Sequence, residues 1–174
     1  MVVIGIDPGI TGAVAFITHG GGVSVEDIPT LPIAGGGLVK RRISGRALGD
    51  LLLSQCPIGN HATVFCEDVA TMGGRNNAVQ TQGSLLRSLG AIEAVVEMLR
   101  WPMVKVGARE WQGLYKLAGK RRQERARGEL PAAIGVAVGL YPDAAQRLSR
   151  VKDHNRAEAL LIAHFGKRRY FDEL

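Results

Sequence analysis

The sequence predicts an α/β fold, formed as one domain over residues 1–174. Short apolar segments open the chain, and later apolar segments alternate with segments of helical periodicity, which is typical of α/β proteins. A chain of 174 residues is long enough to bury a core and short for two ordinary domains. Hydrophobic residues make up 46% and charged residues 22%, which excludes a disordered or fibrous protein.

Short apolar runs bounded by turn residues predict the strands. Residues 2–6 are continuously apolar and end at Asp-Pro-Gly, which indicates a buried strand followed by a turn. Residues 11–18 have the pattern of a hairpin partner for that strand. Residues 29–37 are rich in Pro and Gly and predict a loop. The remaining strands are expected at residues 22–28, 62–66 and 102–106.

The longest predicted helix covers residues 78–100. Its apolar residues recur at the spacing of an amphipathic helix, namely Leu85, Leu89, Ile92, Val96 and Leu99. Gly83, Gly90 and Ala94 form a second stripe, where another backbone can approach closely, either within the chain or across a dimer interface. Shorter helices are expected at residues 43–53, around Trp111 and Leu117, and at residues 131–141 and 156–165.

The charge balance favours a polyanionic partner. Lysine and arginine number 22 against 16 acidic residues, a net charge of +6 with a pI near 9.7, and nucleic acid is the leading candidate. Cys56 and Cys66 do not form a CxxC pair, so neither a disulfide framework nor a structural zinc site is indicated. Without a basic leader or an apolar run near the ~18 residues that span a membrane, we expect a cytoplasmic protein with no membrane partner.

Acidic residues follow two of the predicted strands and open a predicted buried helix. Asp7 lies between a strand and Pro8-Gly9, where it either forms the turn or faces a ligand. Glu67 also ends a strand, and strand alternation places its neighbour Asp68 on the opposite face. Glu158 precedes the apolar run ALLIA, and a buried carboxylate there requires either a cationic partner or a metal ion.

A fourth ligand is expected just before that helix, from Asp153 or His154. Helical geometry places His154 nearer to Glu158, but oxygen ligands suit Mg²⁺ better than imidazole, so Asp153 is the preferred ligand and His154 the preferred proton carrier. The alternative is that Asp153 only caps the helix. An oxygen-rich site of this kind suits Mg²⁺ or Mn²⁺, and two such ions can hydrolyse a phosphodiester. With the basic charge, this predicts a nuclease.

Motifs spread along the chain resemble those of a known family. The segments GIDPGITGAVAF, VFCEDV and VKDHNRAEALLIAHFG are similar to those of the RuvC-type Holliday-junction resolvases, in the ribonuclease H-like superfamily. The RAEALL core is closest to the phage and plant-organelle branch. The segments VKVGAREWQGLYKL and GLYP are similar as well, so the resemblance covers residues 2–166.

The resemblance implies a ribonuclease H-like mixed five-stranded sheet flanked by helices, in a homodimer that resolves four-way DNA junctions by paired nicks. It also implies Mg²⁺ as cofactor, with Mn²⁺ as a substitute and two ions per site. Asp7, Glu67 and Glu158 match the family's acidic positions, although many members have Asp where this chain has Glu158. The helix at residues 78–100 corresponds to the family's dimer helix.

Two basic segments are candidates for DNA contact. The run KRRQERAR at residues 120–127 is either a solvated face or a phosphate-binding segment. The loop after the Glu67 strand can read base edges or cap a helix. The DNA-binding candidates are Lys120, Arg121, Arg122, Arg125, Arg75, Asn76 and Asn77, with weaker support for Lys40, Arg41 and Arg42. Trp111 is more typical of a core residue than of a base-stacking platform.

Three other functions share some of these features. Asp7, Gly9 and Thr11 match the DxGxT phosphate loop of the actin and sugar-kinase superfamily, but that machinery needs two such lobes, so no nucleotide cofactor is expected. A YqgF-like RNA nuclease shares the fold and the first motif, and the RAEALL core argues against it. A protein that binds branched DNA without cutting it has no need of three intact acidic motifs.

Overall fold

The central sheet of the molecule contains both parallel and antiparallel strand pairs. The computed structural model describes residues 1–35, 39–69, 79–119, 124 and 129–170. Its five-stranded sheet has the strand order β3-β2-β1-β6-β7. The strands are β1 (Val2–Asp7), β2 (Ala13–Thr18), β3 (Val23–Asp27), β6 (Ala62–Asp68) and β7 (Met103–Gly107). β1, β2 and β3 pair antiparallel, whereas β6 pairs parallel with both β1 and β7.

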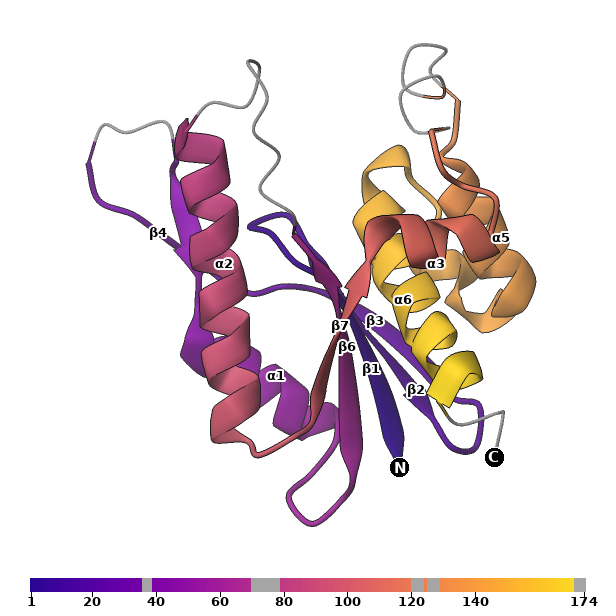
Figure 1. Ribbon diagram of the computed structural model, residues 1–174, viewed down its shortest axis with the longest axis horizontal. Helices are drawn as coiled ribbons and strands as arrows, with labels where there is room; N and C mark the ends of the chain where they lie inside the picture. The colour runs from indigo at the N-terminus through magenta and orange to yellow at the C-terminus, as the bar shows by residue number, and fades with distance from the viewer. Residues whose placement is uncertain (36–38, 70–78, 120–123, 125–128, 171–174) are drawn as a thin grey trace.

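Helices cover both faces of this sheet (Figure 1). The α-helices are α1 (Gly45–Gln55), α2 (Val79–Met98), α3 (Ala108–Leu114), α5 (Ala132–Leu140) and α6 (His154–Tyr170). Two 3₁₀ segments, η1 (Pro142–Arg147) and η2 (Val151–Asp153), lie between α5 and α6. A mixed five-stranded sheet of this order, flanked by helices, is the predicted ribonuclease H-like fold, and the prediction is confirmed.

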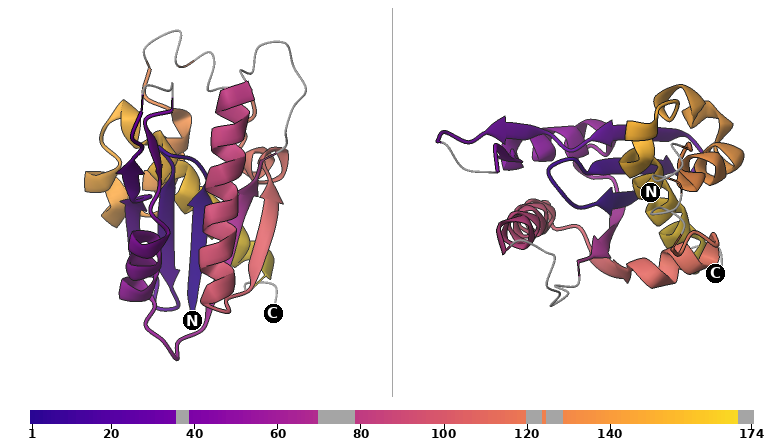
Figure 2. Two further views of the ribbon diagram at one scale, coloured as in Figure 1. Left: turned by 90° about the vertical axis from the view of Figure 1, so that its left-hand side faces the viewer. Right: turned by 90° about the horizontal axis from the view of Figure 1, so that it is seen from above.

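The two faces of the sheet carry two separate apolar cores. One joins Val3, Ala15 and Phe65 to α3, α5 and α6, and the other joins Ile4, Ile6 and Cys66 to α1 and α2. The split follows from strand geometry, because successive side chains point to opposite faces. Figure 2 shows α2 running along the strands on its own side of the sheet.

A two-stranded ribbon replaces part of the predicted loop at residues 29–37. β4 (Thr30–Pro32) pairs antiparallel with β5 (Arg41–Ile43), and the Arg41 side chain donates to Thr30 Oγ1 at 2.7 Å and to Thr30 O at 3.0 Å. The loop prediction is wrong for β4 because its partner strand lies about ten residues further on, beyond the reach of local Pro and Gly signals. The helix predicted at residues 43–53 begins at Gly45, after Ser44, whose hydroxyl accepts from the Ala47 amide.

Gly5 sets the position of α6 on the sheet. A Cβ at this residue would overlap the backbone carbonyl of Ala159 and the backbone nitrogen of Ala163. Asn155, in the first turn of α6, donates to the carbonyl of Thr11 in the turn after β1. The helix therefore lies directly on β1, with its amino end at the carboxyl edge of the strand. Within the described ranges, no helix is both long enough and apolar enough to cross a bilayer.

Candidate functional site

Asp7 and Glu67 come from adjacent parallel strands, at the edge of the sheet where both strands end. Ile6 of β1 pairs with Cys66 of β6, so the two acidic residues are the next ones on their strands. Phe65 packs in the core on the α6 side, and alternation gives Glu67 the same face. Val3 packs in that core as well, and four residues further on Asp7 also faces α6. Both carboxylates thus share one edge and one face.

The electrostatics of Cys66 agree with this placement. The thiol is buried between the two strand ends, and this burial raises its pKa. The negative charges of Asp7 and Glu67 raise the pKa further.

Trp111 holds one oxygen of Glu67. Its indole Nε1–H donates to Glu67 Oε2 at 2.9 Å, and its side chain is only 1% exposed. The contact arises because β7 pairs with β6 and leads directly into α3, which carries Trp111. Sequence reasoning placed Trp111 in the core, which is confirmed, but missed its hydrogen bond. The one available signal was general, since a buried indole N–H usually finds an acceptor.

Glu158 approaches the same region from α6. Its side chain is 8% exposed, as the buried helix predicted from the sequence requires. It lines a cavity of about 50 Å³ together with Trp111, so that tryptophan lies beside both glutamates. Glu124, inside the basic run at residues 120–127, lines the cavity too, and sequence reasoning did not single it out.

Asp153 makes the contacts of a capping residue. Its Oδ2 accepts from the Arg150 backbone N–H at 2.9 Å, and its Oδ1 accepts from Arg150 Nη2 at 2.7 Å. Arg156 Nη1 lies 3.6 Å from Oδ1. These arginine contacts lower the pKa of Asp153, and the carboxylate is 2% exposed. Asp153 thus ends η2 in a capping box with Arg150 and does not cap α6, and its role as a metal ligand stays a prediction.

His154 is the first residue of α6, and its Nδ1 lies 3.1 Å from the carbonyl of Val151. The helix is continuous from His154 to Glu158, so these residues lie one turn apart on one face. The side chain is half-buried. Of the two candidates before the helix, His154 is thus the one that α6 brings to the side of Glu158.

The donor set fits a divalent cation that prefers oxygen. Mg²⁺ usually takes one or two protein carboxylates and completes its shell with water and substrate phosphate. Asp7 and Glu67 supply two such carboxylates from neighbouring strand ends. Within the part of the chain that the structure describes, no three His, Cys, Asp or Glu side chains are arranged to hold an ion by themselves. The fit is therefore to an ion that substrate helps to coordinate.

The predicted DNA-binding residues lie outside the described ranges. They are Arg75, Asn76, Asn77, Lys120, Arg121, Arg122 and Arg125. The small-residue stripe of α2, in contrast, is described and exposed: a Cβ on Gly83 or Gly90 would meet nothing within 4 Å. The described parts of the chain leave those two positions uncovered.

Comparison with known proteins finds similar structures only. A scan against protein-family models and a search of the curated proteins each find no match. A solved structure of Thermus thermophilus RuvC is similar over 97% of this chain and 96% of that chain, with a TM-score of 0.46 and 19% identity. A second, of T. thermophilus RuvC in complex with a Holliday junction substrate, covers 98% and 96%, with a TM-score of 0.49 and 16% identity. Both are structures of RuvC, the family that the sequence motifs resemble.

Proposed function

We propose that this protein is a structure-selective endodeoxyribonuclease that resolves four-way DNA junctions by paired, metal-dependent nicks. The observation that carries the proposal is that Asp7 and Glu67 end adjacent parallel strands on the face that α6 covers, and that Trp111, which donates to Glu67, lines a cavity together with Glu158. A net charge of +6 supports a polyanionic substrate, and the acidic residues supply the opposite charge that a cation needs beside a phosphate.

Asp7 and Glu67 are the proposed holders of Mg²⁺, for which Mn²⁺ can substitute, with Glu158 completing a site for two ions. When bound, the cations supply an activated water and stabilise the leaving oxygen of the phosphodiester. Trp111 is a positioning residue, because its hydrogen bond to Oε2 orients the other oxygen of Glu67. His154 is the proposed proton carrier, since an imidazole exchanges protons near neutral pH and lies one turn from Glu158.

Paired nicks require two sites, and we propose a homodimer formed through the exposed face of α2. That face presents the uncovered glycines together with Leu86, which is 46% exposed, and Met98, which is 70% exposed. Small residues allow two helices to approach closely, and the apolar side chains gain stability when water is excluded. The segments around Arg75 and Arg121 are proposed to contact the DNA backbone.

The test is a cleavage assay on four substrates: a synthetic four-way junction, a linear duplex, a single-stranded RNA and ATP. We expect symmetric cuts in the junction with Mg²⁺ or Mn²⁺, none with EDTA, and much weaker cutting of the duplex. Cleavage of RNA with no cleavage of the junction would favour an RNA nuclease. Junction binding without any nick would leave a binding protein, and hydrolysis of ATP would favour the phosphate-loop interpretation.

The acidic residues give the sharper version of this test. Asp7→Asn, Glu67→Gln and Glu158→Gln each remove a negative charge, and each is expected to abolish cleavage while junction binding persists, because phosphate contacts depend on Lys and Arg. Asp68→Asn is the matched control, an exposed carboxylate adjacent to Glu67 on the other face of β6. If the Asp68 variant were also inactive, charge near the site, not coordination, would explain the loss.

A further inference from the structure

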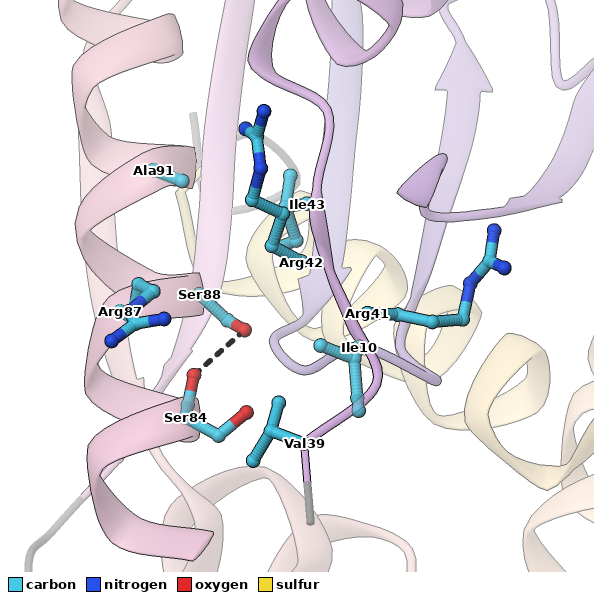
Figure 3. Close-up of a pocket in the computed structure, with 9 residues that line it drawn as sticks. All are labelled: Ile10, Val39, Arg41, Arg42, Ile43, Ser84, Arg87, Ser88 and Ala91. Atoms are coloured by element: carbon cyan, nitrogen blue, oxygen red, sulfur yellow. Dashed lines mark hydrogen bonds between the residues drawn. The ribbon is translucent and has the colours of Figure 1, made fainter. Parts of the chain in front are cut away.

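A second pocket lies between the β4–β5 ribbon, the first half of α2 and the turn after β1 (Figure 3). It has a volume of about 130 Å³. Its lining residues are Ile10, Val39, Arg41, Arg42, Ile43, Ser84, Arg87, Ser88 and Ala91. Three of these residues are arginines and none is acidic, so the pocket is cationic.

The interior and the rim of this pocket differ in chemistry. In Figure 3 the hydroxyl groups of Ser84 and Ser88 face the hollow together with the side chain of Val39. Ser88 is 3% exposed, and its hydroxyl donates to the carbonyl of Ser84 at 2.9 Å. Arg42 stands on the ribbon side and Arg87 on the helix side, and both are exposed. A cationic rim above a mostly apolar hollow with hydroxyl groups suits an anion that carries an organic body.

Arg42 and Arg87, like Arg46 and Arg100, have no carboxylate partner among the described residues, whereas four other arginines do. Arg147 pairs with Glu26, Arg150 with Asp153, Arg156 with Asp27 and Arg169 with Glu110. Arg41, the third arginine of the pocket, is turned away from the helix and bonded to Thr30. Arg42 from the ribbon and Arg87 from the helix both line this hollow, and an arriving anion displaces no ion pair of either residue among the described residues.

The pocket lies close to the carboxylate site along the chain. Ile10, which lines it, is three residues after Asp7, so their Cα atoms are at most roughly 11 Å apart. Successive nucleotides of one DNA strand are spaced by about 3.4 Å along the duplex axis. The pocket is thus within roughly three nucleotides of a phosphate held at Asp7. It lies on the α2 side of the sheet, however, whereas the carboxylates face α6.

We infer that this pocket binds a backbone phosphate of the DNA strand that is cut, a few nucleotides from the cut itself. Arg42 and Arg87 would contact this phosphate, and Ser84 lies within the hollow. The inference deepens the proposed function and rests on it. A strand held here passes over the turn after β1 before it reaches Asp7 and Glu67. Occupation of the pocket therefore sets which phosphate reaches the carboxylates.

The test measures binding of a four-way junction by the cleavage-deficient Asp7→Asn protein, with and without Arg42→Gln and Arg87→Gln. Loss of both arginines from the one bound phosphate is expected to weaken binding at least tenfold at about 150 mM salt. It should also lower the slope of log affinity against log salt by about 0.9, the value for one neutralised phosphate. Arg100→Gln combined with Arg168→Gln is the control, since it removes the same two charges at exposed residues that do not line the pocket. An unchanged slope in the double variant would overturn the inference.

Neutral methylphosphonate linkages, introduced one at a time, locate the contact. One position within three nucleotides of the cut is expected to weaken binding of the parent protein and to have no effect on the Arg42→Gln, Arg87→Gln protein. If the unmodified protein does not cut junctions but this binding pattern appears, the proposed function is wrong and the pocket inference is supported. If it cuts junctions but the pattern is absent, only the pocket inference is wrong. A different outcome is that inorganic phosphate raises the melting temperature only when Arg42 and Arg87 are present, while DNA does not. That result would assign the pocket to a small anion and would also overturn the inference.

Discussion

The helices α6 and α2 cover opposite faces of the same sheet, and they are packed in opposite ways. From Ala157 to Ala163, α6 is buried at every residue, and Gly5 of β1 lies so close beneath it that no side chain fits between them. Gly83 and Gly90 of α2 face open space, and Leu86 and Met98 are exposed on the same helix. Gly5 of β1 allows α6 to pack closely on the sheet, whereas Gly83 and Gly90 of α2 lie on an uncovered surface of that helix.

This difference separates the two parts of the proposed activity. Glu158 is held by contacts inside one chain, because α6 packs directly on the backbone of β1 at Gly5. The α2 layer adds nothing to that geometry and leaves one face available to a partner. A tightly packed layer therefore positions the carboxylates, and a loosely covered layer is available for assembly and for the DNA strand.

The strongest test of the contrast is a matched pair of glycine substitutions. Gly5→Ala places a Cβ against the Ala159 and Ala163 backbone, and we expect a loss of about 3 kcal/mol in the free energy of unfolding. Gly90→Ala, on an open helical position, is expected to stabilise the chain by about 0.8 kcal/mol, because alanine has the higher helix propensity. Urea denaturation measures both values. Equal stabilities would show that α6 is not seated on β1 as described.

Trp111→Phe tests whether the α6 side orients the carboxylates. The indole donor to Glu67 is lost, and we expect the Mg²⁺ concentration for half-maximal cleavage to rise about 10- to 100-fold, the usual effect of removing a group that orients a ligand. Trp101→Phe, a tryptophan packed against the core on the α2 side, is the matched control and should leave that concentration unchanged. Fluorescence of Trp111 in the Trp101→Phe protein should also respond to Mn²⁺, which provides a readout independent of cleavage.

The pH dependence of stability tests the start of α6. Arginine contacts lower the pKa of Asp153 in the folded protein, below its unfolded value of about 3.9. Its contribution to stability is therefore complete above pH 4 and is lost as the pH falls through the folded pKa. At pH 7 we expect the Asp153→Asn protein to unfold at a lower urea concentration than the parent. At pH 3 the urea midpoints of the two proteins should be nearly equal. A constant difference between the two pH values would contradict the ion pairing.

Leu86→Glu has the smallest expected effect on the fold and a large one on assembly. An exposed helical position tolerates the change within about 0.5 kcal/mol of unfolding free energy at concentrations where the chain is monomeric. A like charge in both copies is expected to shift a dimer to monomer in analytical ultracentrifugation. Leu140→Glu, at a similarly exposed leucine at the end of α5, is the control. A parent protein that sediments as a monomer while cutting junctions symmetrically would exclude the α2 interface.

Local patterns in the sequence were enough to predict most of the elements. Continuous apolar residues predicted β1, and the 3-and-4 spacing predicted α2, since burial on one face leaves a period in the chain itself. The strand after residue 62 ended near Glu67, as expected, and Glu158 was recognised as a buried carboxylate within an apolar helix. Each of these inferences depends on neighbours within one turn or one strand.

Contacts between distant segments were decided by the tertiary structure. Glu67 and Trp111 are 44 residues apart, and only the pairing of β6 with β7 brings them together. Gly5 resembles any small residue of an apolar strand until α6 is placed on it. The residue type of Asp153 allows capping or coordination, and its bonds to Arg150 at the start of η2 became evident only in the structure. A linear pattern records how each segment is buried, but it does not record which segments meet, because that depends on how the layers pack.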